Sequence, residues 1–234
     1  TWGFYDVLFH GQPFCFQRPY GSYVMENVLF KISFPAEFHA QTAVECAMQL
    51  HPLLRGRLDG IAKITLRTHE SALRIIDKKG PLDNPADRDH CIQYMTAVPL
   101  VFGRLSASDY EDSVAADPRI DALRARMQVR ENAGFTADYY LRDKRYIGNA
   151  VQVFFRDGTA TERVQVDYPV GHRRRRAEGQ PLLVRKFEDS VRACFDASRA
   201  QRIVACFADS QALLEMSVDE LMGLLVRPDA MEKK

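Results

Sequence analysis

Two alternating segments joined by an Asp-Gly pair constrain the fold more than any other part of the sequence. Residues 150–155 and 162–168 alternate apolar and polar side chains, and Asp157-Gly158 lies between them. A period of two places alternate side chains on opposite faces of a strand, and Asp-Gly favours the tight turn of a hairpin. We therefore predict an antiparallel hairpin with a two-residue turn, so the chain must contain a sheet.

Three further segments carry periodic patterns of apolar side chains. Residues 28–34 and residues 63–69 alternate as the hairpin segments do, so each predicts a strand. Residues 40–51 carry apolar side chains three and four positions apart, which predicts an amphipathic helix. Proline lacks the backbone N–H that a helix interior uses, so we expect Pro52 to end this helix.

Capping residues predict helices in the middle of the chain. A long helix is predicted over residues 84–102, with Asn84 as its N-cap and Pro85 at its first position. A weak capping box predicts a short helix over residues 106–114, and an Asp-Pro pair predicts another over residues 117–127. The region between the second predicted strand and the hairpin is therefore expected to be helical.

The last third of the chain also reads as helices. Pro181 is expected to begin one helix, and the capping box that starts at Ser217 is expected to begin the last. Strands and helices occur without a strict strand–helix–strand alternation, which favours an α+β fold over a parallel α/β fold.

Charge and composition exclude several classes of protein. The 32 Lys and Arg residues nearly balance the 31 Asp and Glu residues, so no global field recruits nucleic acid or an anionic membrane. The apolar runs are short and the N-terminus lacks the pattern of an export signal, so we expect neither a spanning helix nor secretion. We expect a cytosolic protein, and because the chain starts without Met, we expect that upstream residues have been removed.

Cysteine and histidine spacing gives no sign of a metal site. The 5 cysteines are scattered without a C-x-x-C pair, and the 6 histidines form neither H-x-x-x-H nor H-E-x-x-H. The sequence also lacks G-x-G-x-x-G, a Walker sequence and G-x-S-x-G. We therefore expect no metal and no cofactor, and neither nucleotide binding nor serine hydrolysis has support.

Three longer segments resemble one known protein family. Residues 18–39 include KISFPAEFH, residues 84–95 read NPADRDHCIQYM, and residues 168–176 read YPVGHRRRR. Together they resemble the MmgE/PrpD family, and the similarity extends over nearly the whole chain, residues 2–225. Family members are much longer, so the resemblance implies that this chain is a C-terminal half whose partner, a large N-terminal helical domain, is missing.

The resemblance implies an architecture. It is an α+β fold with a small mixed or antiparallel sheet and packed helices, followed by C-terminal helices that belong with a helical domain. Residues 1–22 would end the N-terminal helical domain and connect it onward, and residues 23–170 would form the α+β lobe. Residues 171–234 would form the C-terminal helical segment.

The resemblance also implies a reaction. It is the removal of water from 2-methylcitrate to give 2-methylaconitate in propionate breakdown, with citrate as an alternative substrate. No iron–sulfur cluster takes part, which agrees with the scattered cysteines because such clusters need thiolate ligands at suitable spacing. The small-molecule tricarboxylate is thus the implied ligand, the parent enzyme is implied to be a homodimer, and this chain alone is expected to be inactive.

Dehydration of a hydroxy tricarboxylate needs a base, an acid for the departing hydroxyl and cations for the carboxylates. By resemblance, Lys31 and His39 are the catalytic candidates, on either side of an aromatic-proline pair. Glu37 or Gln41 are alternatives for the second position, because spacing around the proline varies in the family. Taken without the resemblance, Lys31 reads as a solvent-facing strand lysine and His39 as a helix-start residue with a local hydrogen bond.

Four further residues are candidates for substrate binding. Arg88 and His90 lie near the start of the predicted long helix, where they either bind the substrate or belong to a capped helix start. Arg173 and Arg174 belong to a run of arginines, and guanidinium groups bind carboxylates bidentately. The alternative for the whole chain is a non-catalytic binding or oligomerisation module in which this arginine-rich loop contacts a subunit or an acidic partner.

Overall fold

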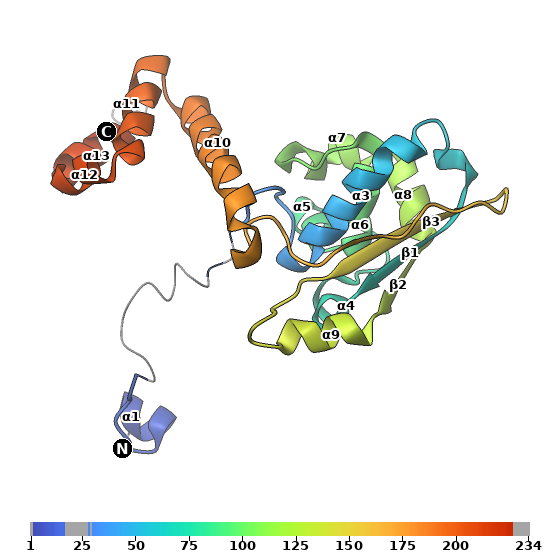
Figure 1. The fold of residues 1–234 in the computed structure, drawn as a ribbon, viewed down its shortest axis with the longest axis horizontal. Coiled ribbons are helices and arrows are strands. Elements are labelled where there is room, and N and C mark those ends of the chain that lie inside the picture. The colour runs from blue at the N-terminus through green and yellow to red at the C-terminus, as the bar shows by residue number, and fades with distance from the viewer. Residues whose placement is uncertain (1, 17–27, 29, 227–234) are drawn as a thin grey trace.

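A mixed four-stranded sheet organises the α+β part of the molecule (Figure 1). The computed structural model describes residues 2–16, 28 and 30–226. The strands lie in the order β2-β1-β3-β4. Their bounds are Ile61–Thr68 for β1, Met127–Glu131 for β2, Asn149–Phe155 for β3 and Val164–Val166 for β4. β1 pairs parallel with β2 and antiparallel with β3, and β3 and β4 form the predicted hairpin.

The hairpin turn is longer than predicted. The N–H of Phe155 donates to the carbonyl of Thr159 at 2.8 Å, so residues 156–158 form the loop between them. The Asp157 carboxylate accepts from the Thr159 N–H at 2.9 Å, and Gly158 adopts a left-handed φ of 85°. The prediction of a two-residue turn is therefore wrong, because the aspartate bonds forward to the threonine and closes a three-residue loop.

Helices cover one face of the sheet and form the core with it (Figure 1). Helix α3 (Gln41–Leu54) packs on β3, β4 and α6 (Ile92–Phe102), and α6 packs in turn on α8 (Pro118–Ala125). Buried and less buried positions alternate along β1 and β3, as expected for a sheet with one covered face. The fully buried side chains of these two strands include Ile64, Leu66, Val151 and Val153.

Short elements connect this core and extend it. They are α1 (Phe4–Phe9), η1 (Phe38–Ala40), η2 (Leu58–Gly60), α4 (Glu70–Ile76), α5 (Pro85–Asp89), η3 (Ala107–Tyr110), α7 (Asp112–Ala115) and α9 (Ala133–Tyr140). The C-terminal elements are η4 (Arg173–Arg175), α10 (Arg176–Cys194), α11 (Ala197–Ala208), α12 (Ser210–Glu215) and α13 (Val218–Leu225). None of the helices in the described part of the chain is both long enough and apolar enough to cross a membrane.

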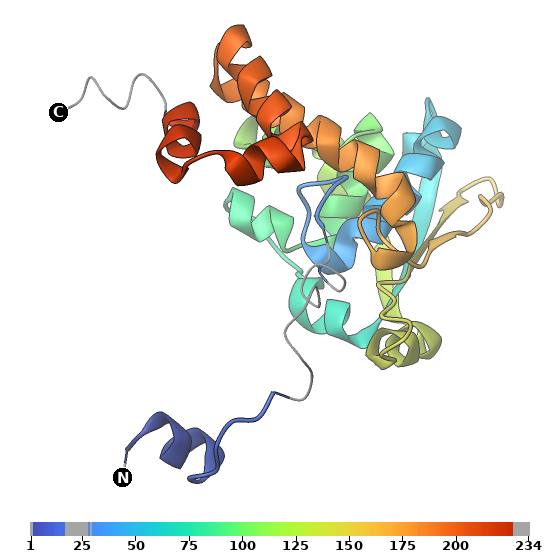
Figure 2. The same cartoon turned by 60° about the vertical axis from the view of Figure 1, so that its left-hand side comes forward.

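The C-terminal helices have a small core of their own. Figures 1 and 2 show α10 beside the α+β core, with α11, α12 and α13 at the far end of α10. Val191, Ala200, Ile203 and Leu224 form the buried cluster of this segment. A bidentate ion pair links it to the α+β core, since the Arg175 guanidinium contacts the Glu45 carboxylate at 2.8 and 3.0 Å. The predicted α+β fold class with C-terminal helices is confirmed.

The strand predicted over residues 28–34 is absent. Residue 29 lies outside the described part, and residues 28 and 30–34 form no strand. The carbonyl of Val28 accepts from the Arg176 guanidinium at 2.9 Å, and that of Lys31 accepts from the Lys186 ammonium at 2.5 Å. The carbonyls of Val28 and Lys31 therefore bond to side chains of α10, while Phe34 packs on the α+β core.

Pro52 and Pro181 do not mark helix boundaries as predicted. Pro52 lies inside α3, which continues to Leu54, and Pro181 lies inside α10, which begins at Arg176. A proline removes one hydrogen bond, and packing on the rest of the helix outweighs this loss. The long helix predicted over residues 84–102 is two helices, α5 and α6, separated at residues 90–91. The helix predicted through residue 127 stops at residue 125, since Met127 begins β2.

Candidate functional site

Four ionisable side chains gather where η1, the end of β1 and α9 meet. They are Glu37, His39, His69 and Tyr139. Glu37 is the N-cap of η1, and His39 lies within that short helix. His69 is the residue between β1 and α4, and Tyr139 lies in the last turn of α9. These four side chains form the candidate site.

Glu37 holds the His39 ring from one side. One carboxylate oxygen lies 2.8 Å from Nδ1 of His39, and the other accepts from the His39 backbone N–H at 2.7 Å. Both side chains are largely buried, with exposures of 14% for His39 and 15% for Glu37. Burial by itself would raise the pKa of Glu37, but the hydrogen bonds and the charge of His39 hold it below its usual value. An ionised Glu37 accepts only, so Nδ1 of His39 donates.

Tyr139 contacts the other ring nitrogen. Its hydroxyl lies 3.3 Å from Nε2 of His39. When Nδ1 carries the proton of a neutral imidazole, Nε2 carries the lone pair, so the phenol donates to it. The site thus aligns a carboxylate, an imidazole and a phenol, and it leaves Nε2 as the basic atom of His39.

His69 is a buried, neutral ring beneath this line of groups. Its side chain is fully buried, and it stacks on Tyr139 with ring centroids 4.6 Å apart and an interplanar angle of 15°. Its centroid lies 5.1 Å from that of His39. Burial, then the nearby charge of His39, lowers the pKa of His69 to about 4, although the carbonyl of Gly148 partly opposes this. Within the described residues, Nε2 of His69 has no hydrogen-bond partner.

A buried amide fixes the backbone of the site against the sheet. The side-chain N–H₂ group of Asn149, the first residue of β3, donates to the carbonyl of His39 at 2.8 Å and to the Thr42 hydroxyl at 2.7 Å. The Thr42 hydroxyl in turn donates to the carbonyl of Ile147. Gln41 donates to two backbone carbonyls of residues 34–36, at 2.9 and 2.8 Å. The turn that carries Glu37 and His39 is thus tied to β3 and to the start of α3.

Lys31 lies on the segment that bonds to α10. Its side chain is exposed, and its carbonyl accepts from Lys186. Among the residues that the structure describes, no hydrogen bond or ion pair joins Lys31 to His39. The two predicted catalytic residues are therefore not in direct contact, and the role of Lys31 stays a prediction.

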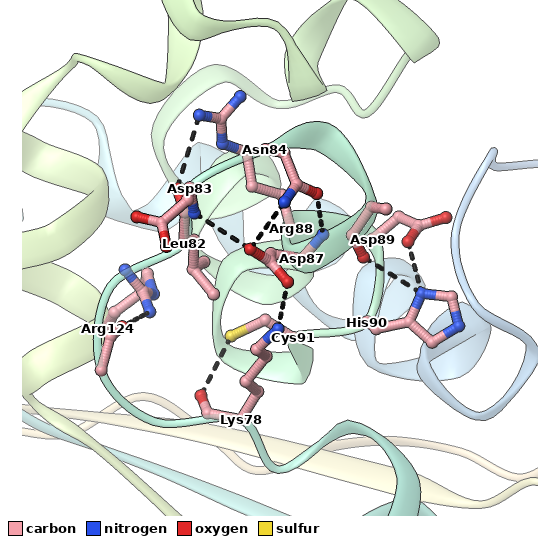
Figure 3. A network of polar contacts seen from close by, with 12 residues as sticks. Lys78, Leu82, Asp83, Asn84, Asp87, Arg88, Asp89, His90, Cys91 and Arg124 are labelled. Atoms are coloured by element: carbon pink, nitrogen blue, oxygen red, sulfur yellow. Dashed lines mark hydrogen bonds and ion pairs between the residues drawn. The ribbon is translucent and has the colours of Figure 1, made fainter.

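Arg88 and His90 belong to a separate polar network around α5 (Figure 3). The Arg88 guanidinium is 5% exposed and donates to the carbonyl of Tyr110 at 2.5 Å and to the Asp112 carboxylate at 2.6 Å. His90 is exposed, and its Nδ1 lies 2.5 Å from the Asp89 carboxylate. These two hydrogen bonds of Arg88 fasten α5 to η3 and to α7. These contacts do not test substrate binding, so the binding role of Arg88 and of His90 stays a prediction.

The arginine run divides between several partners. Arg173 and Arg174 donate to the carbonyl of Asp143 at 2.6 and 3.0 Å. Arg175 instead contacts Glu45, as described above, and Glu178 at 2.6 Å. Arg173 and Arg174 therefore share one backbone partner, whereas Arg175 binds carboxylates elsewhere, and the binding role of Arg173 and Arg174 stays a prediction.

Two members of the cluster were missed from the sequence. His69 is the last residue of the strand predicted over residues 63–69, and that position at a strand end was the available signal. Tyr139 lies in α9, in a region expected to be helical but without an individual helix predicted there, and nothing local to it points toward His39. In the described ranges, no group of three or more His, Cys, Asp or Glu residues is arranged to hold a metal ion.

The fold and the cluster define an α+β domain that carries an imidazole with one nitrogen held by a carboxylate, an arrangement suited to proton transfer. The model of the MmgE/PrpD C-terminal domain matches residues 34–211, and the chain belongs to this family. The resemblance expected from the sequence is confirmed.

Three similar proteins from different organisms carry the same name, 2-methylcitrate dehydratase. The chain is 61% identical over 228 residues to 2-methylcitrate dehydratase of Cupriavidus necator, covering 96% of this chain and 47% of that protein. It is 58% identical over 232 residues to the mitochondrial 2-methylcitrate dehydratase of Yarrowia lipolytica, covering 98% and 44%. It is 59% identical over 229 residues to that of Salmonella typhimurium, covering 97% and 47%. The chain spans slightly less than half the length of the curated relatives it matches.

Proposed function

We propose that this chain is the C-terminal part of a hydro-lyase that converts 2-methylcitrate to 2-methylaconitate. The observation that carries the proposal is the identity of 58–61% over nearly the whole chain to proteins named 2-methylcitrate dehydratase. An α+β domain whose ionisable cluster presents one basic nitrogen supports the same conclusion. Citrate is the alternative substrate, and the complete active site includes groups from the half of the relatives that this chain does not cover.

In the proposed reaction His39 moves a proton through Nε2. Nε2 has one lone pair, so the substrate first displaces the Tyr139 hydroxyl from it. The nitrogen then takes the proton from the carbon next to a carboxylate, the electrons of that C–H bond form the C=C bond, and the neighbouring hydroxyl leaves. An acid from elsewhere in the complete site protonates the hydroxyl, so that it leaves as water. Glu37 stabilises the imidazolium that forms, because its carboxylate already accepts from Nδ1.

The carboxylates of the substrate need cationic partners. Lys31 is proposed as a second catalytic group, and Arg88, His90, Arg173 and Arg174 are proposed to bind the substrate. Lys31 and His90 are exposed side chains. The Arg88 guanidinium already has protein partners, so its proposed contact with the substrate must compete with them. A cytosolic homodimer is also part of the proposal, tested by cell fractionation and by light scattering of the complete protein.

A chimera tests the activity. This chain would replace the matching part of the Cupriavidus necator relative, and absorbance of the enoate product would follow the dehydration of 2-methylcitrate. We expect turnover by the chimera and none by this chain alone. No turnover by a folded chimera would contradict the proposed activity, and robust turnover by this chain alone would contradict a shared site.

Point variants of the chimera test the two catalytic residues. His39→Ala should lower kcat by about 10²-fold or more, as expected for loss of a general base. Lys31→Ala should lower turnover severely as well, whereas Lys79→Ala, at a side chain that is 83% exposed, should not. Circular dichroism must show that each variant is folded. Near-parent rates for His39→Ala or Lys31→Ala would remove that residue from the mechanism.

A further inference from the structure

We propose that Tyr139 and His69 are positioning residues for His39: the phenol holds Nε2 of His39 in place, and the His69 ring holds the phenol. The inference rests on the proposed function, in which Nε2 moves the proton. Neither residue was singled out by the sequence, and both act through His39 in this inference.

The phenol suits both protonation states of the imidazole. Before the substrate binds, the phenol lies 3.3 Å from Nε2 and donates to the neutral ring, and after the product leaves it accepts from the same nitrogen until His39 gives up its proton. Glu37 accepts from Nδ1 in both states. The ring therefore keeps one orientation between turnovers, and each substrate that displaces the phenol meets Nε2 already in place.

His69 supplies a rigid platform for the phenol. It is fully buried at the end of β1, and its ring lies nearly parallel to that of Tyr139, with centroids 4.6 Å apart. The helix that carries Tyr139 is fastened to the start of α4, since the Glu70 N–H donates to the Thr136 hydroxyl at 3.0 Å. The direction of the Tyr139 hydroxyl is thus set by the stack on His69 and by the hydrogen bond that fastens α9 to α4.

The platform uses the ring of His69 rather than its nitrogens. Within the described part of the chain, Nε2 has no hydrogen-bond partner and Nδ1 lies 3.5 Å from the Thr68 hydroxyl, at the limit of a hydrogen bond. The Gly148 carbonyl only partly offsets the lowering of the ring's pKa by burial. A phenylalanine keeps a flat ring in the same place. His69→Phe is therefore the conservative variant that should retain the function, and His69→Ala is the matched variant that should lose it.

Kinetics of the chimera test the positioning role. Tyr139→Phe removes one hydrogen bond and should lower kcat by about tenfold with little change in KM. His69→Ala should lower kcat by a similar factor, and His69→Phe should stay within about twofold of the parent. The double variant Tyr139→Phe with His69→Ala should be no slower than Tyr139→Phe alone, because His69 acts through the phenol.

Nitrogen NMR tests the same inference without any activity. In this chain labelled with ¹⁵N-histidine, the Nε2 resonance of His39 should shift in Tyr139→Phe, shift similarly in His69→Ala and stay in place in His69→Phe. If the chimera is inactive but these shifts appear, the proposed reaction fails and the positioning role stands. Three results would overturn the inference. The kcat losses of Tyr139→Phe and His69→Ala could multiply in the double variant, or His69→Phe could lose as much kcat as His69→Ala. The third result is an Nε2 resonance of His39 that does not shift in Tyr139→Phe.

Discussion

Burial of His69 predicts that the fold loses stability as the pH falls below 7. The pKa of this ring is lowered to about 4 from an ordinary value of 6.5, chiefly by burial. Between these two values the unfolded chain binds a proton that the folded chain does not bind. The free energy of unfolding therefore falls as the pH falls through this window, and this contribution is complete above pH 6.5 and lost toward pH 4.

The size of the loss follows from the two pKa values. A group that titrates at 6.5 when unfolded and at about 4 when folded costs about 2 kcal/mol between pH 7 and pH 5, and roughly 3 kcal/mol by pH 4. His172 is 1% exposed, and burial and the neighbouring arginines lower its pKa to about 4 as well. It should contribute a similar loss. Domains of this kind have a total stability of roughly 5–15 kcal/mol, so together the two rings should remove a large part of it by pH 4.

Urea unfolding followed by circular dichroism at pH 7, 6 and 5 measures this loss. His69→Phe should reduce the pH dependence by about 2 kcal/mol across this range, and His172→Phe should do the same. His90→Phe is the control, because it removes an exposed histidine and leaves both buried rings in place. The range stops at pH 5 because the pKa of Glu37 is also lowered from its ordinary value of 4.5. Below pH 4.5, Glu37 therefore also reduces the free energy of unfolding as the pH falls. A full pH dependence in His69→Phe would refute the argument from burial.

Two further predictions concern the join between the α+β core and α10. Arg175→Met leaves the half-buried Glu45 carboxylate without its bidentate partner and should lower the free energy of unfolding by about 1–3 kcal/mol. Urea unfolding measures this loss, and an unchanged midpoint would contradict the prediction. Gly171→Ala should cost more than Gly158→Ala, because a Cβ at Gly171 would lie 2.1 Å from the carbonyl oxygen of Phe30, whereas none of the described atoms lies within 4 Å at Gly158. Both glycines have positive φ, so equal melting temperatures would show that the close approach has no effect.

Local patterns were enough to predict several elements and the family. The hairpin, the first predicted helix and the caps at Asn84, Asp117 and Ser217 are all present in the structure. Each depends on side chains within a few positions of one another, so neighbouring residues carry the information. The family resemblance also follows from the sequence alone, because long ordered segments match.

The composition of the site was decided by tertiary structure. His39 and Tyr139 are 100 positions apart, and their contact depends on the packing of α9 beside α4, which no local pattern encodes. β2 was also missed, since it pairs in parallel with β1 and its partner lies far away in the sequence. Residues 28–34 alternate like a strand, but the carbonyls of Val28 and Lys31 bond to side chains of α10. The spacing of apolar residues determines which face of a segment is apolar. Which helix or strand packs on that face is determined only by the tertiary structure, because the two elements lie far apart in the sequence.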